Sequence, residues 1–194
     1  CAQRPQPRRV VDLEKEAETR AGCRCPQPHS LDEFRKHVAG CAKPEQHEAL
    51  SRKYLKEQPA GTVLYQPRFM VPNRFYTQAG LRFPERGVTV PIGFSHFLPD
   101  LIAIEDDHLR PGKRLAVIID AKASDEMKLS HRMQATFYAR VLQCWLDEDG
   151  CSDVRIASVS GIWRPGCSQP DMFPLQDIGN VLDRFLHEDI GRIL

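Results

Sequence analysis

Short apolar runs and stripes at helical spacing follow one another along this chain, and their order predicts a mixed α/β fold. Four runs have strand composition, and they cover residues 62–72, 96–107, 114–122 and 153–163. Three segments have helical patterning, over residues 44–57, about 125–146 and about 175–194. The predicted order is therefore helix, three strands, helix, strand, helix, with no internal repeat.

Turn residues refine this outline. Pro67 interrupts the first run, which favours an edge strand or a bulge. A short turn at residues 110–112 joins the second and third runs, so we expect these strands to pair antiparallel. Residues 73–93 have the character of an insertion or hairpin, and residues 11–20 that of a short helix after an extended arm.

Helical spacing also predicts which side chains of two helices are buried. Ser124 and Asp125 are candidate N-caps of the middle helix. Its expected buried stripe consists of Tyr138, Val141, Leu142 and Trp145. The expected buried positions of the last helix are Ile178, Val181, Leu182 and Phe185.

Composition limits the class of protein more than its partners. The chain has 194 residues, of which 41% are hydrophobic, enough for one domain and a small appendage. Since 27 basic residues face 26 acidic ones, a nucleic-acid role must rest on a local basic surface. No apolar run approaches the roughly 20 residues of a membrane span, and no signal peptide is visible. Seven cysteines without a secretory signal favour reduced thiols and a cytoplasmic or nuclear location. The first residue, Cys1, suggests a piece of a longer protein.

Candidate chemistry lies at the end of the third strand. The apolar residues 116–119 read as a buried strand, and Asp120 and Lys122 follow it, two positions apart and so on one side. Asp100 belongs to the preceding strand and is expected to approach Asp120. Two carboxylates on apolar strands repel each other, and a divalent cation, Mg²⁺ or Mn²⁺, would resolve the conflict. Lys122 would then orient a water molecule beside the metal.

These residues resemble the signature of the PD-(D/E)XK nuclease superfamily. Pro99-Asp100 is followed, after nineteen residues, by Asp120-Ala121-Lys122. The resemblance implies a restriction-endonuclease-like αβββαβ core, with a mixed central sheet flanked by helices. It also implies a metal held by Asp100, Asp120 and the Ala121 carbonyl, with Lys122 as a catalytic residue.

A second motif is similar to the QxxxY signature of the RecB-like branch, which includes the CRISPR-adaptation nucleases. Gln134 and Tyr138 are four residues apart on the helix after the third strand, and therefore share a face. In that branch the pair positions the substrate strand and the catalytic lysine. The family also takes a Glu or His from its first core helix, for which Glu48 is the first candidate and His47 the second. His96 could also face the site.

The N-terminal segment, residues 1–43, contains a separate cysteine and histidine cluster. Its candidate zinc ligands are Cys23, Cys25, His37 and Cys41, with His29 as a substitute. Only one residue separates the first cysteine pair, whereas zinc fingers prefer two to four, so scattered reduced thiols are the favoured alternative. Some RecB-like nucleases carry an iron–sulfur cluster, but Cys144, Cys151 and Cys167 are too widely spread to favour one.

The sequence therefore predicts a metal-dependent DNA nuclease domain over residues 44–194, after an N-terminal arm. The resemblance implies DNA as a partner, no membrane, and a place beside a helicase in a larger repair or defence system. Three alternatives stay open. They are a non-LTR retrotransposon endonuclease, a catalytically silent nuclease-fold module that binds DNA or docks onto a helicase, and a structural α/β domain.

Overall fold

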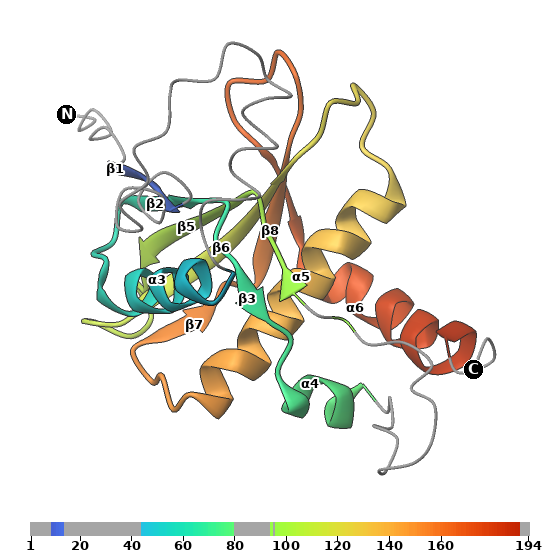
Figure 1. The fold of residues 1–194 in the computed structure, drawn as a ribbon. Helices are drawn as coiled ribbons and strands as arrows, with labels where there is room; N and C mark the ends of the chain where they lie inside the picture. The colour runs from blue at the N-terminus through green and yellow to red at the C-terminus, as the bar shows by residue number, and fades with distance from the viewer. Residues whose placement is uncertain (1–8, 14–43, 80–93, 95, 191–194) are drawn as a thin grey trace, which may run out of the picture.

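The computed structural model describes residues 9–13, 44–79, 94 and 96–190. These residues form an α/β fold with a mixed central sheet flanked by helices (Figure 1). The α/β class and the mixed sheet predicted from the sequence are thus confirmed.

The main sheet has the strand order β1-β2-β5-β6-β8-β9, and β7 also pairs with β6. β1 is parallel to β2, β6 is parallel to β7 and β8, and the other neighbours are antiparallel. The strands of this sheet are β1 (Arg9–Asp12), β2 (Thr62–Tyr65), β5 (Leu101–Asp106), β6 (Arg114–Ala121), β7 (Val154–Ile156), β8 (Val159–Trp163) and β9 (Asp171–Pro174).

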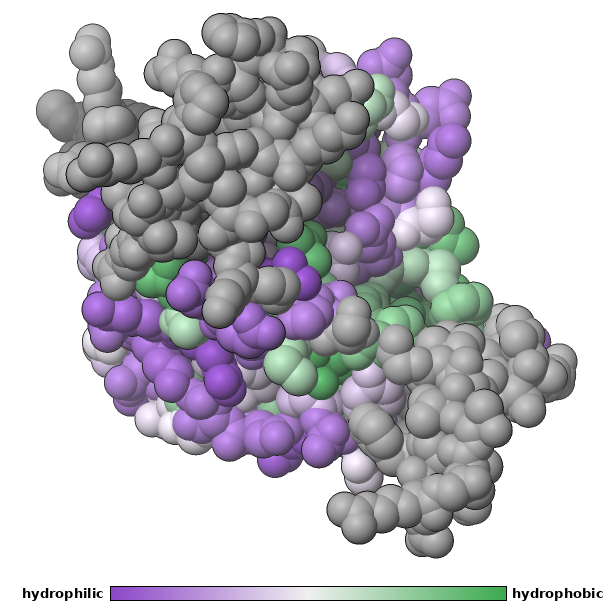
Figure 2. Space-filling view, in the orientation of Figure 1, coloured by the Kyte–Doolittle hydropathy of each residue, from purple (hydrophilic) through white to green (hydrophobic). Residues whose placement is uncertain are grey.

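A second, two-stranded sheet consists of β3 (Phe69–Met70) and β4 (His96–Phe97), which pair antiparallel. The described helices are α3 (Pro44–Glu57), α4 (Asn73–Gln78), α5 (Leu129–Glu148) and α6 (Leu175–Arg184), followed by a π-helical turn, η1 (Phe185–Ile190). The surface over α3 is largely hydrophilic in the space-filling view (Figure 2).

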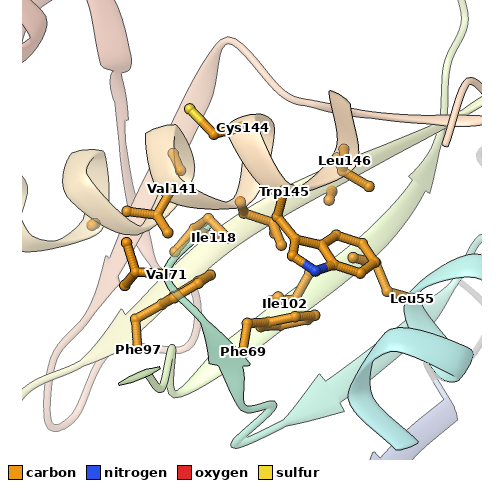
Figure 3. Packing of buried hydrophobic residues seen from close by; sticks show 14 of the residues in the cluster. Leu55, Phe69, Val71, Phe97, Ile102, Ile118, Val141, Cys144, Trp145 and Leu146 are labelled. Carbon is orange, nitrogen blue, oxygen red and sulfur yellow. The ribbon is translucent and has the colours of Figure 1, made fainter. Parts of the chain in front are cut away.

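The core lies between one face of the sheet and the helices α3 and α5. Ile102 of β5 pairs with Ile118 of β6, and both side chains are fully buried on this face. Trp145 of α5 lies 5.5 Å from Phe69, measured between ring centroids, and Leu55 of α3 joins them (Figure 3). Full burial of each such side chain contributes about 1.5–3 kcal/mol, so this layer fixes the position of α5 over the sheet.

The expected antiparallel pairing of the second and third strands is confirmed as β5 and β6. A buried ion-pair cluster holds their connection in place. Asp107 is 2% exposed and accepts hydrogen bonds from Arg110 and, at two oxygens, from Arg155 of β7. These guanidinium groups hold the pKa of Asp107 well below its usual range. The cluster therefore fixes the connection between β5 and β6 against β7.

Three predicted strands are broken where the chain must turn. Residues 62–72 form β2 and β3, separated by Gln66, which has a left-handed φ of 46°, and by Pro67. Residues 96–107 form β4 and β5, with a bend that contains Asp100. Residues 153–163 form β7 and β8, because the Ser158 carbonyl turns away to accept a hydrogen bond from Leu175 N. Strand β9 was not predicted.

Two predicted helix starts are wrong. Val11 and Asp12 belong to β1, while residues 14–20 lie outside the described part of the chain. The middle helix begins at Leu129 and not near residue 125, since the Ser124 hydroxyl accepts a hydrogen bond from Glu126 N in a local turn. Within residues 73–93, the described part contains helix α4.

In the last helix, the predicted burial is correct for Ile178 and Leu182, which are 5% and 3% exposed, and wrong for two positions. Val181 and Phe185 are each 41% exposed. The buried stripe continues from Leu182 to Leu186, four residues on, and the two exposed side chains lie one position ahead of it.

Candidate active site

Strand β6 carries a carboxylate from the core to the edge of the fold. Its residues Ala116 and Ile118 are fully buried on the α5 side of the sheet. Asp120 continues this alternation and is 1% exposed, while Ala121 beside it is exposed. Asp120 is therefore a buried carboxylic acid near the end of an apolar strand.

Asp100 reaches the same point from the bend before β5, and not from inside the strand as the sequence predicted. Its Oδ2 atom accepts a hydrogen bond of 2.7 Å from Ala121 N. Its carboxyl group also contributes to raising the pKa of Asp120. The bend frees Asp100 from the strand ladder, so its side chain can fold over the end of β6.

Lys122 lies on the same side of the strand end as Asp120, as the two-residue spacing predicted. Its backbone N–H donates to the Trp163 carbonyl of β8 over 2.9 Å, which extends the parallel ladder past Ala121. Its Nζ atom lies 2.5 Å from Asp120 Oδ2, and its side chain is 19% exposed. The ammonium group is thus anchored by both backbone and side chain.

Two residues of helix α5 continue the hydrogen-bonded chain that begins at Lys122. Lys122 Nζ donates to Gln134 Oε1 over 2.9 Å, and Gln134 Nε2 donates to the Tyr138 hydroxyl over 2.7 Å. The Tyr138 ring stacks on Phe97 of β4, with 5.8 Å between the centroids. Because the amide is fixed at its nitrogen end, its oxygen is directed at the lysine.

The surroundings of Asp120 shift its pKa. Burial raises the pKa of Asp120 to about 6, the neighbouring Asp100 carboxyl adds to this rise, and the Lys122 ammonium opposes it. Asp120 Oδ2 is buried and has no aligned hydrogen-bond donor among the described residues, despite the nearby ammonium. Burial also raises the pKa of Tyr138, which stays a neutral hydroxyl at physiological pH.

Sequence reasoning missed His131. It stands three residues before Gln134 and seven before Tyr138, a spacing that places it on the same face of α5. Burial lowers its pKa, as do the nearby positive charges of Lys122 and Lys128. The two lysines therefore make the rim of the site positively charged at the start of α5, and the His131 imidazole beside them is kept neutral at physiological pH.

The first helix places its two candidates differently. His47 is 8% exposed and its pKa is lowered by burial, an effect that the backbone of Gln66 opposes; the Gln66 N–H donates to the Asp100 carbonyl over 2.8 Å. Glu48 instead lines a cavity with Trp145 near the far end of α5. Of the two, His47 is the residue that the described contacts connect to Asp100.

His96 lies in β4, where its pKa is lowered by burial and by the charge of Arg68. Its acidic neighbours are Glu45 and Glu48. The candidate zinc ligands Cys23, Cys25, His37 and Cys41, and also His29, lie outside the described residues.

The other cysteines are separate thiols. Cys144 is buried inside α5 against Gln78, and Cys151 and Cys167 are half-buried. In the part of the chain that the structure describes, no group of three or more His, Cys, Asp or Glu side chains could hold a metal ion. Mg²⁺ often needs only one or two carboxylates plus water, and the buried, unaligned Asp120 Oδ2 beside Asp100 fits that demand.

Compared with family models, curated proteins and solved structures, the chain matches none. Among the described residues, no helix has the length and apolarity that crossing a membrane requires. The site is therefore interpreted from its own geometry.

Proposed function

We propose that this chain is a metal-dependent nuclease that hydrolyses phosphodiester bonds in DNA. The observation that carries the proposal is the convergence of Asp100, Asp120 and Lys122 at one strand end. An accidental ion pair would not account for two mutually repelling carboxyl groups at a buried position, nor for a lysine held by a helix residue.

The order of elements supports a restriction-endonuclease-like core. Taken in chain order, α3, β2, β5, β6, α5 and β8 give the pattern αβββαβ, with the acids on β6 and before β5. The small β3–β4 sheet and α4 are inserted between the first two of these strands. This agreement is independent of the short motifs, because it rests on the order of the helices and strands along the chain.

Asp100 and Asp120, with the Ala121 carbonyl, would hold a magnesium or manganese ion. When bound, such an ion lowers the pKa of water and offsets charge on a phosphate. A bound cation would also offset the burial and the neighbouring Asp100 carboxyl, which together raise the pKa of Asp120.

The chain's own groups supply the remaining chemistry. The Lys122 ammonium is pinned between Asp120 and Gln134, and a donor not used by them can face a phosphate oxygen or the attacking water. Gln134 and Tyr138 hold that ammonium in place. The Lys128 ammonium adds a positive charge at the rim that attracts the DNA backbone, although the net charge of the whole chain is only +1.

The test is Mg²⁺- or Mn²⁺-dependent cleavage of DNA by the purified chain. Lys122→Ala should lower the cleavage rate by at least about 100-fold, since it removes a group that acts on the transition state. Asp120→Ala should bind DNA without cleaving it. The matched control is Lys113→Ala, at the opposite end of β6, where the lysine pairs with Asp153.

Three outcomes would contradict the proposal or redirect it. Equal cleavage by wild type and both site variants would refute the assignment. Binding of DNA without cleavage at any metal concentration would indicate a catalytically silent module. Nicking of circular duplexes without degradation of linear ones would favour an endonuclease of the retrotransposon kind.

Co-purification with a helicase would place the chain in the larger repair or defence system that the resemblance implies.

A further inference from the structure

A cavity of about 400 Å³ lies between α3, residues 70–73 and the C-terminal end of α5. Its walls include Glu48, Arg52, Met70, Trp145, Glu148 and Asp149. Glu148 stands ten residues after Tyr138 on α5, or about 15 Å along the helix axis. The cavity is therefore a separate place from the carboxylate site.

Glu48 is the unusual member of this wall. It is only 8% exposed, and within the described residues no hydrogen bond or ion pair reaches its carboxylate. Arg52, one helical turn on, is the partner that helix geometry would favour. Arg52 instead pairs with Asp149 at 3.5 Å and lies over the Trp145 ring, 5.0 Å from its centroid.

Lys56 has the same two partners: it pairs with Asp149 and lies 5.6 Å from the Trp145 centroid. Arg52 and Lys56 are thus committed to Asp149 and the indole, and Lys53, the third cation of α3, pairs with Glu57. His96 is a described basic neighbour of Glu48, but burial lowers the pKa of its imidazole, so the carboxylate, which lines the cavity, is open to a cation from outside the described chain.

The rest of the wall specifies the shape of that partner. Met70, Val71 and Pro72 offer an apolar surface, and the Trp145 Nε1 atom is buried without an acceptor among the described residues. In charge, three carboxylates and one guanidinium line the cavity.

We propose that this cavity binds a small organic cation, an alkylammonium or alkylguanidinium on a short aliphatic stem, with Glu48 as its counter-ion. The stem packs against Met70 and Pro72, beside the Trp145 ring. The volume is in the range of small-molecule sites and suits a free ligand. The inference does not rest on the proposed nuclease activity.

Calorimetric titration of the full chain with agmatine and with 1,5-diaminopentane tests the proposal. We expect saturable binding of at least one, and at least a tenfold loss of affinity in Glu48→Gln. Glu57→Gln is the matched control, since this residue lies on the same helix at an exposed position and pairs with Lys53. Its affinity should equal that of wild type.

A second variant guards against misfolding of Glu48→Gln. Met70 is 52% exposed, so Met70→Lys should fold while placing an ammonium in the cavity that competes with the ligand. Loss of binding in this variant supports the proposal. Absence of binding to wild type, equal binding by Glu48→Gln, displacement by equimolar Mg²⁺, or tighter binding of N-acetyl-arginine amide than of agmatine would each overturn it. Cleavage of DNA is measured separately, so failure here leaves the nuclease test intact.

Discussion

The Asp120 carboxyl is buried between a second carboxyl group, Asp100, and the Lys122 ammonium. Its pKa is raised to about 6, above the 3.8 of a free aspartate. The folded protein therefore holds this proton to a higher pH than the unfolded chain does. It follows that this group favours the fold below about pH 4, and that the benefit is lost as the pH rises through about 6.

Asp120→Asn should accordingly stabilise the metal-free protein at about pH 8. A shift from 3.8 to about 6 corresponds to roughly 3 kcal/mol, and loss of the partner of Lys122 offsets part of it, leaving a gain on the order of 1 kcal/mol. Urea unfolding in a chelator across the pH range measures this gain, which should vanish near about pH 4. Asp106→Asn, at an exposed strand end, is the control. A variant less stable than wild type at about pH 8 would contradict the raised pKa.

Tyr138 positions Gln134, and Gln134 positions Lys122. Tyr138→Phe keeps the ring that stacks on Phe97 but removes the hydroxyl that accepts from the amide. The expected result is a loss of about tenfold in kcat with little change in DNA affinity, as for other groups that orient a reacting residue. Steady-state cleavage kinetics measure the split. A change in KM alone, with kcat retained, would count against a positioning role.

At the scale of elements, β8 supports the end of β6 through close backbone packing. Gly161 pairs with Ile119 of β6, directly before Asp120. A Cβ atom added at Gly161 would lie 2.8 Å from Met172 Sδ and 3.0 Å from Pro170 Cβ. Glycine is therefore required here for the approach of β9 and the segment before it.

Gly161→Ala should lower the free energy of unfolding by about 1–2 kcal/mol, because the added methyl group overpacks this contact. Met172→Ala in the same chain should recover part of the loss, since the sulfur is the nearest obstacle and Met172 is 48% exposed. Urea unfolding of the single and double variants measures both effects. Unchanged stability in Gly161→Ala would show that β9 moves aside freely.

Local spacing explains which parts of the site could be predicted. Asp120 and Lys122 are two apart on a strand, and Gln134 and Tyr138 are four apart on a helix, so each pair shares a face in any fold that keeps these elements. The choice between His47 and Glu48 depends instead on how α3 is rotated against the sheet. Tertiary packing sets that rotation, and one sequence does not encode it in a readable pattern.

The same reasoning applies to the fold. The order of helices and strands follows from apolar periodicity, and it was predicted. Pro67 signalled the interruption between β2 and β3. The breaks in the other two runs were missed, because they depend on partners elsewhere in the chain, as Ser158 does on Leu175. Strand β9 was missed because its four residues contain few apolar positions and end at Pro174.

At the scale of the whole molecule, the main sheet extends into the segment that the sequence assigned to an N-terminal arm. β1 pairs with β2 in parallel, with Val11 beside Leu64. Val11 is 8% exposed and belongs to the main core, whereas Val10 before it is 66% exposed. The first described strand thus contributes to the same core as α3 and α5.

Val11→Asp should destabilise the protein by about 3 kcal/mol, since it buries a charge without a partner. Val10→Asp, on the opposite side of the same strand, should change stability by less than about 0.5 kcal/mol. Chemical denaturation of both variants measures the difference. Similar stability of the two would mean that β1 is dispensable for the fold.

The ladder that carries Lys122 also places an indole at the edge of the candidate site. Trp163 is paired with Ala121, is 38% exposed, and donates its Nε1–H to the Cys167 carbonyl. The second tryptophan, Trp145, is 3% exposed among core rings. The chain therefore contains its own optical probe: emission from the partly hydrated indole should respond when an ion or a nucleic acid arrives, while the enclosed one provides a constant background.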